Sequence, residues 1–411
     1  MKKTIVSLLF LSFVCCTYSQ TLKDYSIKGS FLYGSILKHN KHLENLVTGP
    51  ALGGSLAFEW QTSGSQAWHQ YLNFPTMGVE AVMIDFSNPE MLGQAVGFYP
   101  YLGIPIIRTN YFTLNLKPGA GISFLSKYYS NAPHQDGTLN GANGEPNGAN
   151  GAIGSMMNVF LTCGGNLEIP ITSGFSLTAD YAWNHVSNGS VIQPNSGINM
   201  MNAYVGVKYR PNYKTASMPE RKALSDIPRK FAIEVSLSGG IRELYYKDDK
   251  KFPIAALSVS VHRPMANWYR MGLGVDMFYD GVFGAVYNTF ADETTKNVTH
   301  FQRTYIAADE MKNKIRAGIS WQHEMIIGRL IAGFHFGLYL YDPIKNLEPF
   351  NENGELKKPL IYSYNIDKED GWLYTRASAK YMITDHLFGV VSLKTHLQKA
   401  EFIAFGVGYK F

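Results

Sequence analysis

The chain has 411 residues, including 26 Tyr, 24 Phe and 39 Gly, and a formal net charge of +5. This charge is modest and the Lys and Arg residues are scattered, which argues against a nucleic-acid-binding surface. After the N-terminal segment there is no run of about 18 apolar residues, so the sequence predicts no transmembrane helix, and its aromatic-rich composition favours strands.

Residues 1–19 are typical of a secretory signal peptide. Two lysines precede an apolar run, and small residues at the last and third-last positions predict a mature chain that starts at Gln20. A lipoprotein anchor at Cys15 or Cys16 is less favoured, because bulky residues precede Cys16 where a lipoprotein signal needs a small one. Cleavage would leave Cys163 as the single cysteine, so no intramolecular disulfide is expected.

Alternation of apolar and polar residues predicts eight strands in residues 20–210 and eight more in residues 230–411. Their predicted centres lie near residues 30, 56, 82, 100, 116, 163, 181, 204, 236, 258, 273, 316, 334, 377, 391 and 406. With both termini in the periplasm, the long loops face the cell exterior and short turns such as 108–110 face inward. The long loops are residues 38–49, 128–155, 287–311 and 342–371. This asymmetry is typical of outer-membrane barrels. The inner connection 62–77 is longer than the pattern explains.

An exported chain of short alternating strands fits either a soluble β-sandwich or an outer-membrane β-barrel. The C-terminal residues distinguish the two, because an apolar face alternates with small or polar residues up to the terminal Phe411. Such an end resembles the assembly signal of bacterial outer-membrane barrels, although an ordinary edge strand is the alternative. We therefore predict an all-β, transmembrane antiparallel β-barrel that is inserted into the outer membrane by the barrel assembly machinery.

The chain also contains an internal repeat. Gly93–Gly119 matches Lys314–Leu340 in its strand–turn–strand pattern, and Met201–Arg210 parallels Phe402–Phe411. These matches indicate a diverged tandem repeat of one eight-stranded unit.

The repeat predicts a barrel unit at residues 20–210, a linker at 211–229 and a second, diverged unit at 230–411. One 16-stranded barrel and two eight-stranded barrels in series both fit this pattern. The linker is long for a periplasmic turn, but only the second unit carries the terminal aromatic signal. On that ground we favour one large barrel.

Residues 174–210 combine an amphipathic strand with two polar motifs. One predicted face, apolar and outward, carries Phe175, Leu177, Ala179, Tyr181 and Trp183. The other, lumenal face carries Ser176, Thr178, Asp180, Ala182 and Asn184. His185 and Ser187 continue the outward face. An isolated pair of this kind is usually an interfacial polar pair without chemistry, but beside an aromatic girdle it can attack an ester of a membrane lipid.

Two motifs, His185–Gly189 (HVSNG) and Pro194–Ile198 (PNSGI), resemble those of the outer-membrane lipid A 3-O-deacylases, the PagL or acyloxyacyl hydrolase family. The resemblance is specific over about residues 119–209, vague before Gly93 and only architectural in the second unit. It implies a barrel unit that hydrolyses an ester-linked acyl chain of lipid A, the membrane anchor of lipopolysaccharide. No metal or other cofactor is implied.

The resemblance also implies roles for individual residues. Ser187 would be the nucleophile and His185 its base, and Asn188 with a backbone N–H of Gly189 or Ser190 would stabilise the oxyanion. A serine hydroxyl needs such an adjacent base, because it is a weak nucleophile at neutral pH. Residues i and i+2 of a strand share a face about 6–7 Å apart, a gap that side chains can close.

One position departs from the family pattern. The acidic third member of the family falls at Asn199. By strand parity Asn199 faces outward, toward His185, whereas Asp180 faces the lumen. An asparagine can orient an imidazole but cannot stabilise the imidazolium by charge.

The second unit lacks this constellation. His396 shares a predicted inward face with Ser392 and Lys394, and no serine follows it at two residues, so this unit is expected to be structural.

Two other functions stay open for the protein: a structural barrel that presents loops to partners, and a porin-like channel. Inward charged residues would suit the watery lumen of a channel: Glu234, Arg242, Arg376 and Lys380. The face that carries His185 and Ser187 distinguishes these functions, because only an outward pair meets lipid.

Overall fold

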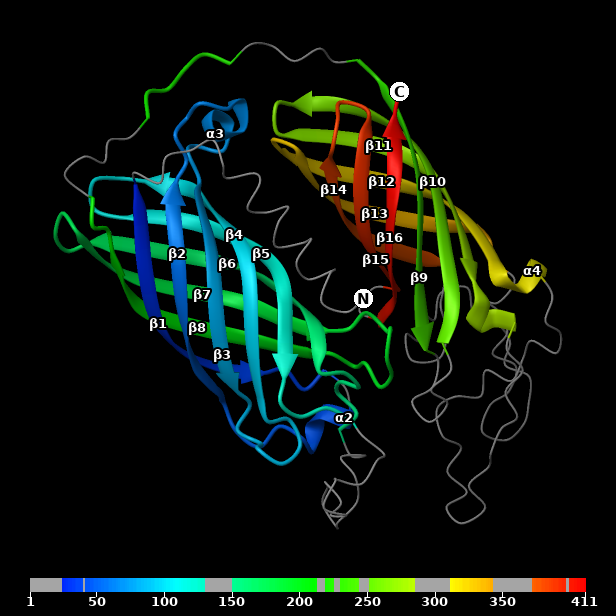
Figure 1. Ribbon diagram of the computed structural model, residues 1–411, viewed down its shortest axis with the longest axis horizontal. Helices are drawn as coiled ribbons and strands as arrows, with labels where there is room; N and C mark the ends of the chain where they lie inside the picture. Colours follow the sequence, from blue (N-terminus) through cyan, green and yellow to red (C-terminus); the bar gives the residue numbers. More distant parts are fainter. Residues whose placement is uncertain are drawn as a thin grey trace.

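A computed structural model describes residues 24–39, 41–129, 150–212, 219–224, 230–243, 251–284, 311–342, 372–396 and 399–411 (Figure 1). The predicted signal peptide lies outside these ranges, as do most of the predicted outer loops 128–155, 287–311 and 342–371. Within the described ranges, none of the helices has the length and apolar character needed to cross a membrane.

The first eight strands form one closed antiparallel barrel, in which each strand pairs with its sequence neighbour and β1 pairs with β8. Its strands are β1 (Tyr25–Ile36), β2 (Ala51–Gln61), β3 (Thr76–Asp85), β4 (Gln94–Arg108), β5 (Thr113–Leu125), β6 (Met157–Pro170), β7 (Phe175–Ser187) and β8 (Ile198–Tyr209). Two short helices lie in its connections, α2 (Lys41–Glu44) and α3 (Ala67–Tyr71). We call the barrel end near α2 the outer end and the end near α3 the inner end.

The remaining strands form a second closed antiparallel barrel, in which β9 pairs with β16. Its strands are β9 (Ala232–Glu243), β10 (Lys251–Ala266), β11 (Tyr269–Asp280), β12 (Ile315–Ile327), β13 (Leu330–Tyr341), β14 (Leu373–Met382), β15 (Leu387–His396) and β16 (Lys399–Lys410). A 3-10 helix, η1 (Gly281–Gly284), and a helix, α4 (Met311–Lys314), flank the connection between β11 and β12. Every predicted strand centre lies inside a strand, so the all-β barrel class is confirmed.

Two barrels stand side by side where the sequence favours one large barrel, and that prediction is wrong (Figure 1). The reason lies in the lumen of each unit. Lys28 of β1 bonds Asp180 of β7 at 3.0 Å across the first lumen, and Lys380 bonds Glu234 at 2.7 Å across the second. An eight-stranded barrel is just wide enough for its side chains to fill the interior, so these pairs favour two small rings. A 16-stranded ring would separate them.

The repeat detected in the sequence maps onto equivalent strands of the two barrels. Residues 93–119 cover β4 and β5, and residues 314–340 cover β12 and β13, the fourth and fifth strands of each barrel. Residues 201–210 and 402–411 likewise fall in the two eighth strands, β8 and β16. The chain crosses from one barrel to the other between Tyr209 and Ala232.

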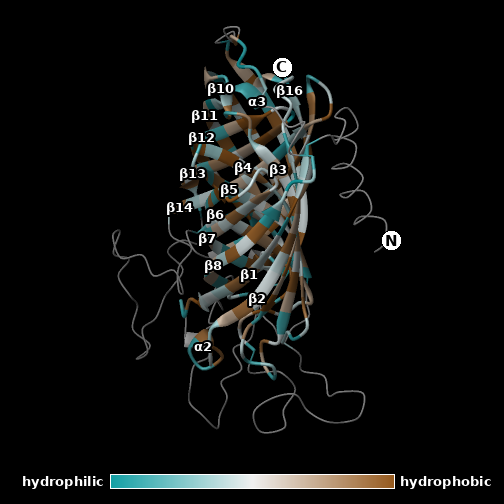
Figure 2. Ribbon diagram, turned by 90° about the vertical axis from the view of Figure 1, so that its left-hand side faces the viewer, coloured by the Kyte–Doolittle hydropathy of each residue, from teal (hydrophilic) through white to brown (hydrophobic). Residues whose placement is uncertain are grey.

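The outer surface of both barrels is apolar, as period-two alternation requires. In the first barrel Phe31, Leu56 and Tyr181 point away from the lumen and are about 60% exposed. Figure 2 shows the resulting alternation of hydrophobic and hydrophilic residues along the strands. These side chains contact lipid in a membrane, whereas the charged residues of the same strands are buried inside.

The long inner connection 62–77 also finds an explanation. It contains α3, which touches the β12–β13 turn of the second barrel. The Tyr71 hydroxyl donates a hydrogen bond to the Ile326 carbonyl at 2.6 Å. A Cβ added at Gly328 of the same turn would lie 3.0 Å from the Trp68 ring. The connection is therefore long because it carries an inter-barrel contact at the inner end.

Candidate active site

The strand β7 presents its histidine and serine on the lipid-facing side of the barrel wall. Tyr181 on this side is 59% exposed. Asn184, which belongs to the opposite face of the strand, points into the lumen and is fully buried. Continuing the alternation places His185 and Ser187 outward at the outer end of the strand. The His185 ring stacks on Trp183, with 5.5 Å between ring centroids and an interplanar angle of 12°.

Asn199 is the register partner of His185 in the β7–β8 pair. The His185 Nδ1 atom lies 2.7 Å from the Asn199 Oδ1 atom. An amide oxygen only accepts hydrogen bonds, so this contact assigns the proton to Nδ1 and leaves Nε2 of a neutral imidazole with its lone pair. The ring is thus held in the tautomer that a general base needs.

His39 is a residue that the sequence analysis missed. Asn199 Nδ2 lies 3.3 Å from His39 Nδ1, and His39 Nε2 lies 3.0 Å from the Ser196 carbonyl oxygen. His39 Nδ1 also lies 3.1 Å from the Leu37 carbonyl oxygen, so both ring nitrogens face a carbonyl acceptor and the ring is held against the Asn199 amide. Closure of the first barrel could have predicted this contact, because it pairs β1 with β8 and places Ile36 opposite Met200.

Ser187 ends β7 and is only 4% exposed although it faces outward. Gly197, which has φ +74°, lies against the pair: an added Cβ would be 2.9 Å from His185 Cε1 and 3.6 Å from Ser187 Cβ. The glycine of the Pro-Asn-Ser-Gly-Ile motif therefore leaves the space that the two side chains occupy. In the described structure Ser187 and His185 share no hydrogen bond, a geometry that does not by itself rule out acid–base chemistry in the absence of substrate.

The loop after Ser187 contains the residues that the sequence predicts as oxyanion donors. Gly189 and Ser190 both have positive φ, +62° and +66°. Within the described residues neither backbone N–H has an acceptor. Asn188 is more occupied than expected, because its amide nitrogen donates to Ser155 Oγ at 2.9 Å and its backbone N–H to Asn195 Oδ1 at 3.0 Å. The free N–H groups thus belong to Gly189 and Ser190, and Asn188 holds the loop.

Comparison with known proteins places this geometry in a family. The family model described as lipid A 3-O-deacylase (PagL) matches residues 52–208, and that described as acyloxyacyl hydrolase, C-terminal domain, matches residues 231–353 and 360–411. The chain belongs to the PagL family. It is a protein of the bacterial outer membrane. A family model matches its second barrel as well, so the resemblance of the second unit is more than architectural.

Solved structures of outer-membrane barrels resemble single parts of this PagL-family chain. The outer membrane enzyme PagL is 15% identical with a TM-score of 0.29, and the match covers 44% of this chain and 97% of that chain. Neisserial surface protein A is 9% identical with a TM-score of 0.29, over 45% and 96% of the two chains. Ail of Yersinia pestis is 12% identical with a TM-score of 0.26, over 46% and 97%. No curated protein matches the chain.

The lumen of the second barrel holds a polar cluster that could be mistaken for a metal site. Glu234, His262 and Glu324 offer ligand atoms within 4.8 Å of one another. Lys380 lies 2.7 Å from both carboxylates, and Arg270 lies 2.6 Å from both. The side-chain cations already neutralise the two carboxylates, so this PagL-family member has an ion-pair network at this point.

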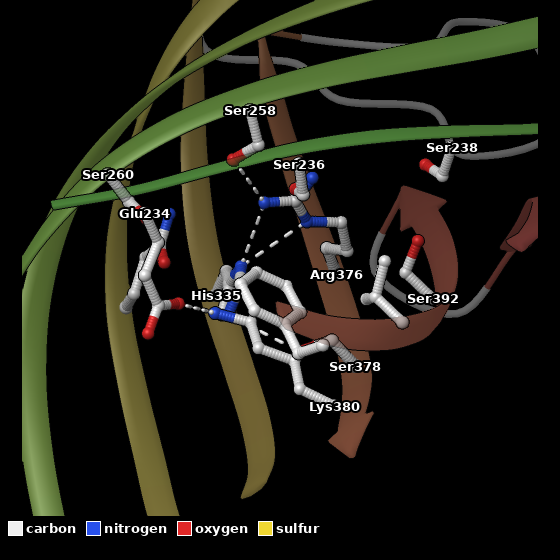
Figure 3. Close-up of a pocket in the computed structure, with 13 residues that line it drawn as sticks. Glu234, Ser236, Ser238, Ser258, Ser260, His335, Arg376, Ser378, Lys380 and Ser392 are labelled. Atoms are coloured by element: carbon white, nitrogen blue, oxygen red, sulfur yellow. Dashed lines mark hydrogen bonds and ion pairs between the residues drawn. The ribbon is translucent and has the colours of Figure 1, made fainter. Parts of the chain in front are cut away.

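A serine-rich cavity lies beside this network (Figure 3). Its volume of about 10 Å³ accommodates roughly one water molecule. Arg376 Nε donates to His335 Nδ1 at 3.2 Å, which leaves the ring proton on Nε2. Ser378 Oγ lies 3.4 Å from that Nε2 and therefore cannot transfer its proton there. The cavity does not activate a nucleophile.

The channel interpretation finds no support in the described lumens. The inward charged residues that suggested a channel form ion pairs in the second barrel. Arg376 lies 2.9 Å from Asp276, and Arg242 lies 2.8 Å from Asp280. In the first barrel an apolar cluster that includes Phe160 fills the outer end. Both interiors are packed with side chains, as the size of an eight-stranded barrel leads one to expect.

Proposed function

We propose that this PagL-family protein hydrolyses an ester-linked acyl chain of lipid A in the outer leaflet, with Ser187 as nucleophile and His185 as base. The main observation in support is the hydrogen bond of 2.7 Å between His185 Nδ1 and Asn199 Oδ1 on the lipid-facing side. It sets the histidine tautomer beside an outward serine, which is the arrangement that ester hydrolysis in a bilayer requires.

The first half-reaction acylates the enzyme. His185 Nε2 takes the Ser187 hydroxyl proton as Oγ attacks the ester carbonyl carbon. The resulting oxyanion accepts hydrogen bonds from the N–H groups of Gly189 and Ser190, and Asn188 keeps this loop in place. Collapse of the tetrahedral intermediate breaks the ester C–O bond, and the His185 imidazolium returns the proton to the departing alkoxide oxygen.

The second half-reaction releases the fatty acid. Water gives a proton to His185 Nε2 and attacks the acyl carbon, and collapse of the second intermediate frees the fatty acid while Ser187 Oγ recovers its proton. Throughout, Asn199 Oδ1 accepts the Nδ1–H and so orients the ring. It supplies no negative charge, and this lowers the stabilisation of the imidazolium relative to an acidic third member.

Insertion by the barrel assembly machinery belongs to the same proposal, since β16 is an amphipathic outer-membrane strand.

The test is mass spectrometry of lipid A from cells that produce the wild-type protein or the Ser187→Ala variant. We expect deacylated lipid A with wild type only, with turnover falling at least about 10³-fold on loss of the nucleophile. Ser392→Ala, at a buried lumenal position of β15, is the matched control and should deacylate normally. Heat-modifiable gel migration verifies folding. Unchanged deacylation by folded Ser187→Ala would refute the assignment.

A further inference from the structure

The loop that carries the oxyanion donors is held by the second barrel. Figure 1 shows the connection between β7 and β8 reaching the ends of β15 and β16. We infer that the second barrel is a positioning scaffold for residues 188–193, with Glu243 as the positioning residue. This inference rests on the proposed function and gives the catalytically silent barrel a role in it.

Hydrogen bonds join the two barrels at the second donor residue, Ser190, and three residues after it, at Gln193. The Gln193 N–H donates to the Glu243 carboxylate at 2.9 Å, and the Glu243 N–H donates to the Ser190 carbonyl at 3.0 Å. The Ser190 hydroxyl donates to the Ala400 carbonyl at 2.8 Å. Glu243 is 4% exposed, so these bonds lie in a dry contact where each contributes more than at a surface.

Apolar packing fixes the same loop from the lipid side. A Cβ added at Gly189 would lie 2.5 Å from Ile403 Cδ1 and 3.4 Å from Leu393 Cδ1. In their strands Ile403 and Leu393 belong to the outward faces, which would contact lipid in a solitary barrel. Here they press against the backbone that bears the donor N–H groups. Only glycine fits at this position, because of both its positive φ and this close approach.

These contacts bear directly on catalysis because an oxyanion donor works only at the right place. Loss of one donor costs about 10²–10³-fold in turnover, and a misplacement of about 1 Å can cost about 10²-fold. The loop has two consecutive residues with positive φ, a conformation that L-residues such as Ser190 adopt only when their surroundings impose it. The contacts of Ser190 to Ala400 and Glu243 supply that constraint.

The first experiment compares Glu243→Ala with Glu243→Gln in purified full-length protein acting on lipid A in micelles. Glu243→Ala removes the acceptor of the Gln193 N–H, so kcat should fall about 10- to 100-fold while KM stays within about twofold. Glu243→Gln keeps an acceptor oxygen and should retain kcat within about threefold. Tyr71→Phe breaks the inter-barrel bond at the inner end and serves as the matched control with unchanged kcat.

Hydrogen–deuterium exchange of the 188–193 amides gives a readout that does not depend on activity. Exchange should rise in Glu243→Ala and stay at the wild-type rate in Tyr71→Phe. If wild type deacylates lipid A but Glu243→Ala matches it in both kcat and exchange, the scaffold role is overturned and the proposed function stands. If wild type shows no deacylation, the proposed function fails, and the exchange data alone decide whether the second barrel orders the loop.

The second experiment is a double-mutant cycle across the barrel contact. Gly189→Ala brings its Cβ against Ile403 and should lower kcat strongly. Adding Ile403→Ala removes the obstructing atoms and should restore at least about threefold of the lost rate, although the strain of positive φ remains. Strictly additive effects of the two substitutions would show that the loop is set without the second barrel and would overturn the inference.

Discussion

The seventh strand of each barrel, β7 or β15, carries a histidine near its outer end, and the two histidines face opposite sides of the wall. His185 points outward beside Ser187 and bonds Asn199 at 2.7 Å. His396 points into the lumen, is 2% exposed, and lies 2.9 Å from the Tyr339 hydroxyl. Because side chains alternate along a strand, a shift of one position moves a residue from lipid to lumen. The same fold thus places one histidine on the lipid-facing side of the wall and the other in a packed interior.

The strands β7 and β15 also differ in the contacts made by the connections at their outer ends. The connection after β7 is long enough to reach Ala400 and Glu243 of the other barrel. Only two residues separate the end of β15 from the start of β16, so this connection is much shorter. A catalytic serine needs donors beside it as well as a base, and within the described residues the loop after β7 is placed to supply them. Each prediction below tests one part of this contrast.

The largest contrast should come from replacing the two histidines in parallel. His185→Asn removes the general base, so release of fatty acid should fall at least about 10³-fold. His396→Asn alters only a lumenal contact and should leave turnover within about twofold. Fatty-acid release from lipid A in micelles measures both. A strong loss in folded His396→Asn would mean that the second lumen takes part in the reaction.

A smaller effect is expected at Asn199. Asn199→Ala removes the hydrogen bond that orients His185, and we expect turnover to fall about 10- to 100-fold through loss of positioning. Asn199→Glu keeps an acceptor and adds a counter-ion for the imidazolium, so turnover should hold steady or rise. A carboxylate near the interface costs little, which lets the barrel fold. If Asn199→Ala left the rate of fatty-acid release unchanged in the same assay, Asn199 would not be the residue that orients His185.

The smallest effect should come from His39, which has no counterpart beside His396 among the described residues. His39→Ala removes the ring that lies against the Asn199 amide while the Asn199–His185 bond survives, so kcat should fall about two- to fivefold. His386→Ala, an exposed histidine at the inner end of the second barrel, is the control and should have no effect. If His39→Ala lowered kcat as much as Asn199→Ala, the two residues would act as one unit.

The strands and their faces could be read from the sequence because both depend on local periodicity. Alternation around Tyr181 and Trp183 placed His185 and Ser187 outward, and the same parity placed Asn199 beside them and His396 in the lumen. A period of two repeats within a few residues, so no distant contact is needed to detect it. The family motifs added roles to those positions, and the matching family models agree with the resemblance.

Ring closure and every contact between distant segments were decided by the tertiary structure. The pairing of β1 with β8, and not with β16, depends on lumenal bonds such as Lys28–Asp180, whose partners lie 152 residues apart. His39 reaches Asn199 over 160 residues, and Ser190 reaches Ala400 over 210. Such pairs leave no periodic signal, because their geometry follows from how two closed rings pack rather than from neighbouring residues. The sequence therefore located the proposed nucleophile and its proposed base, while the residues that hold them in place emerged only when the barrels came together.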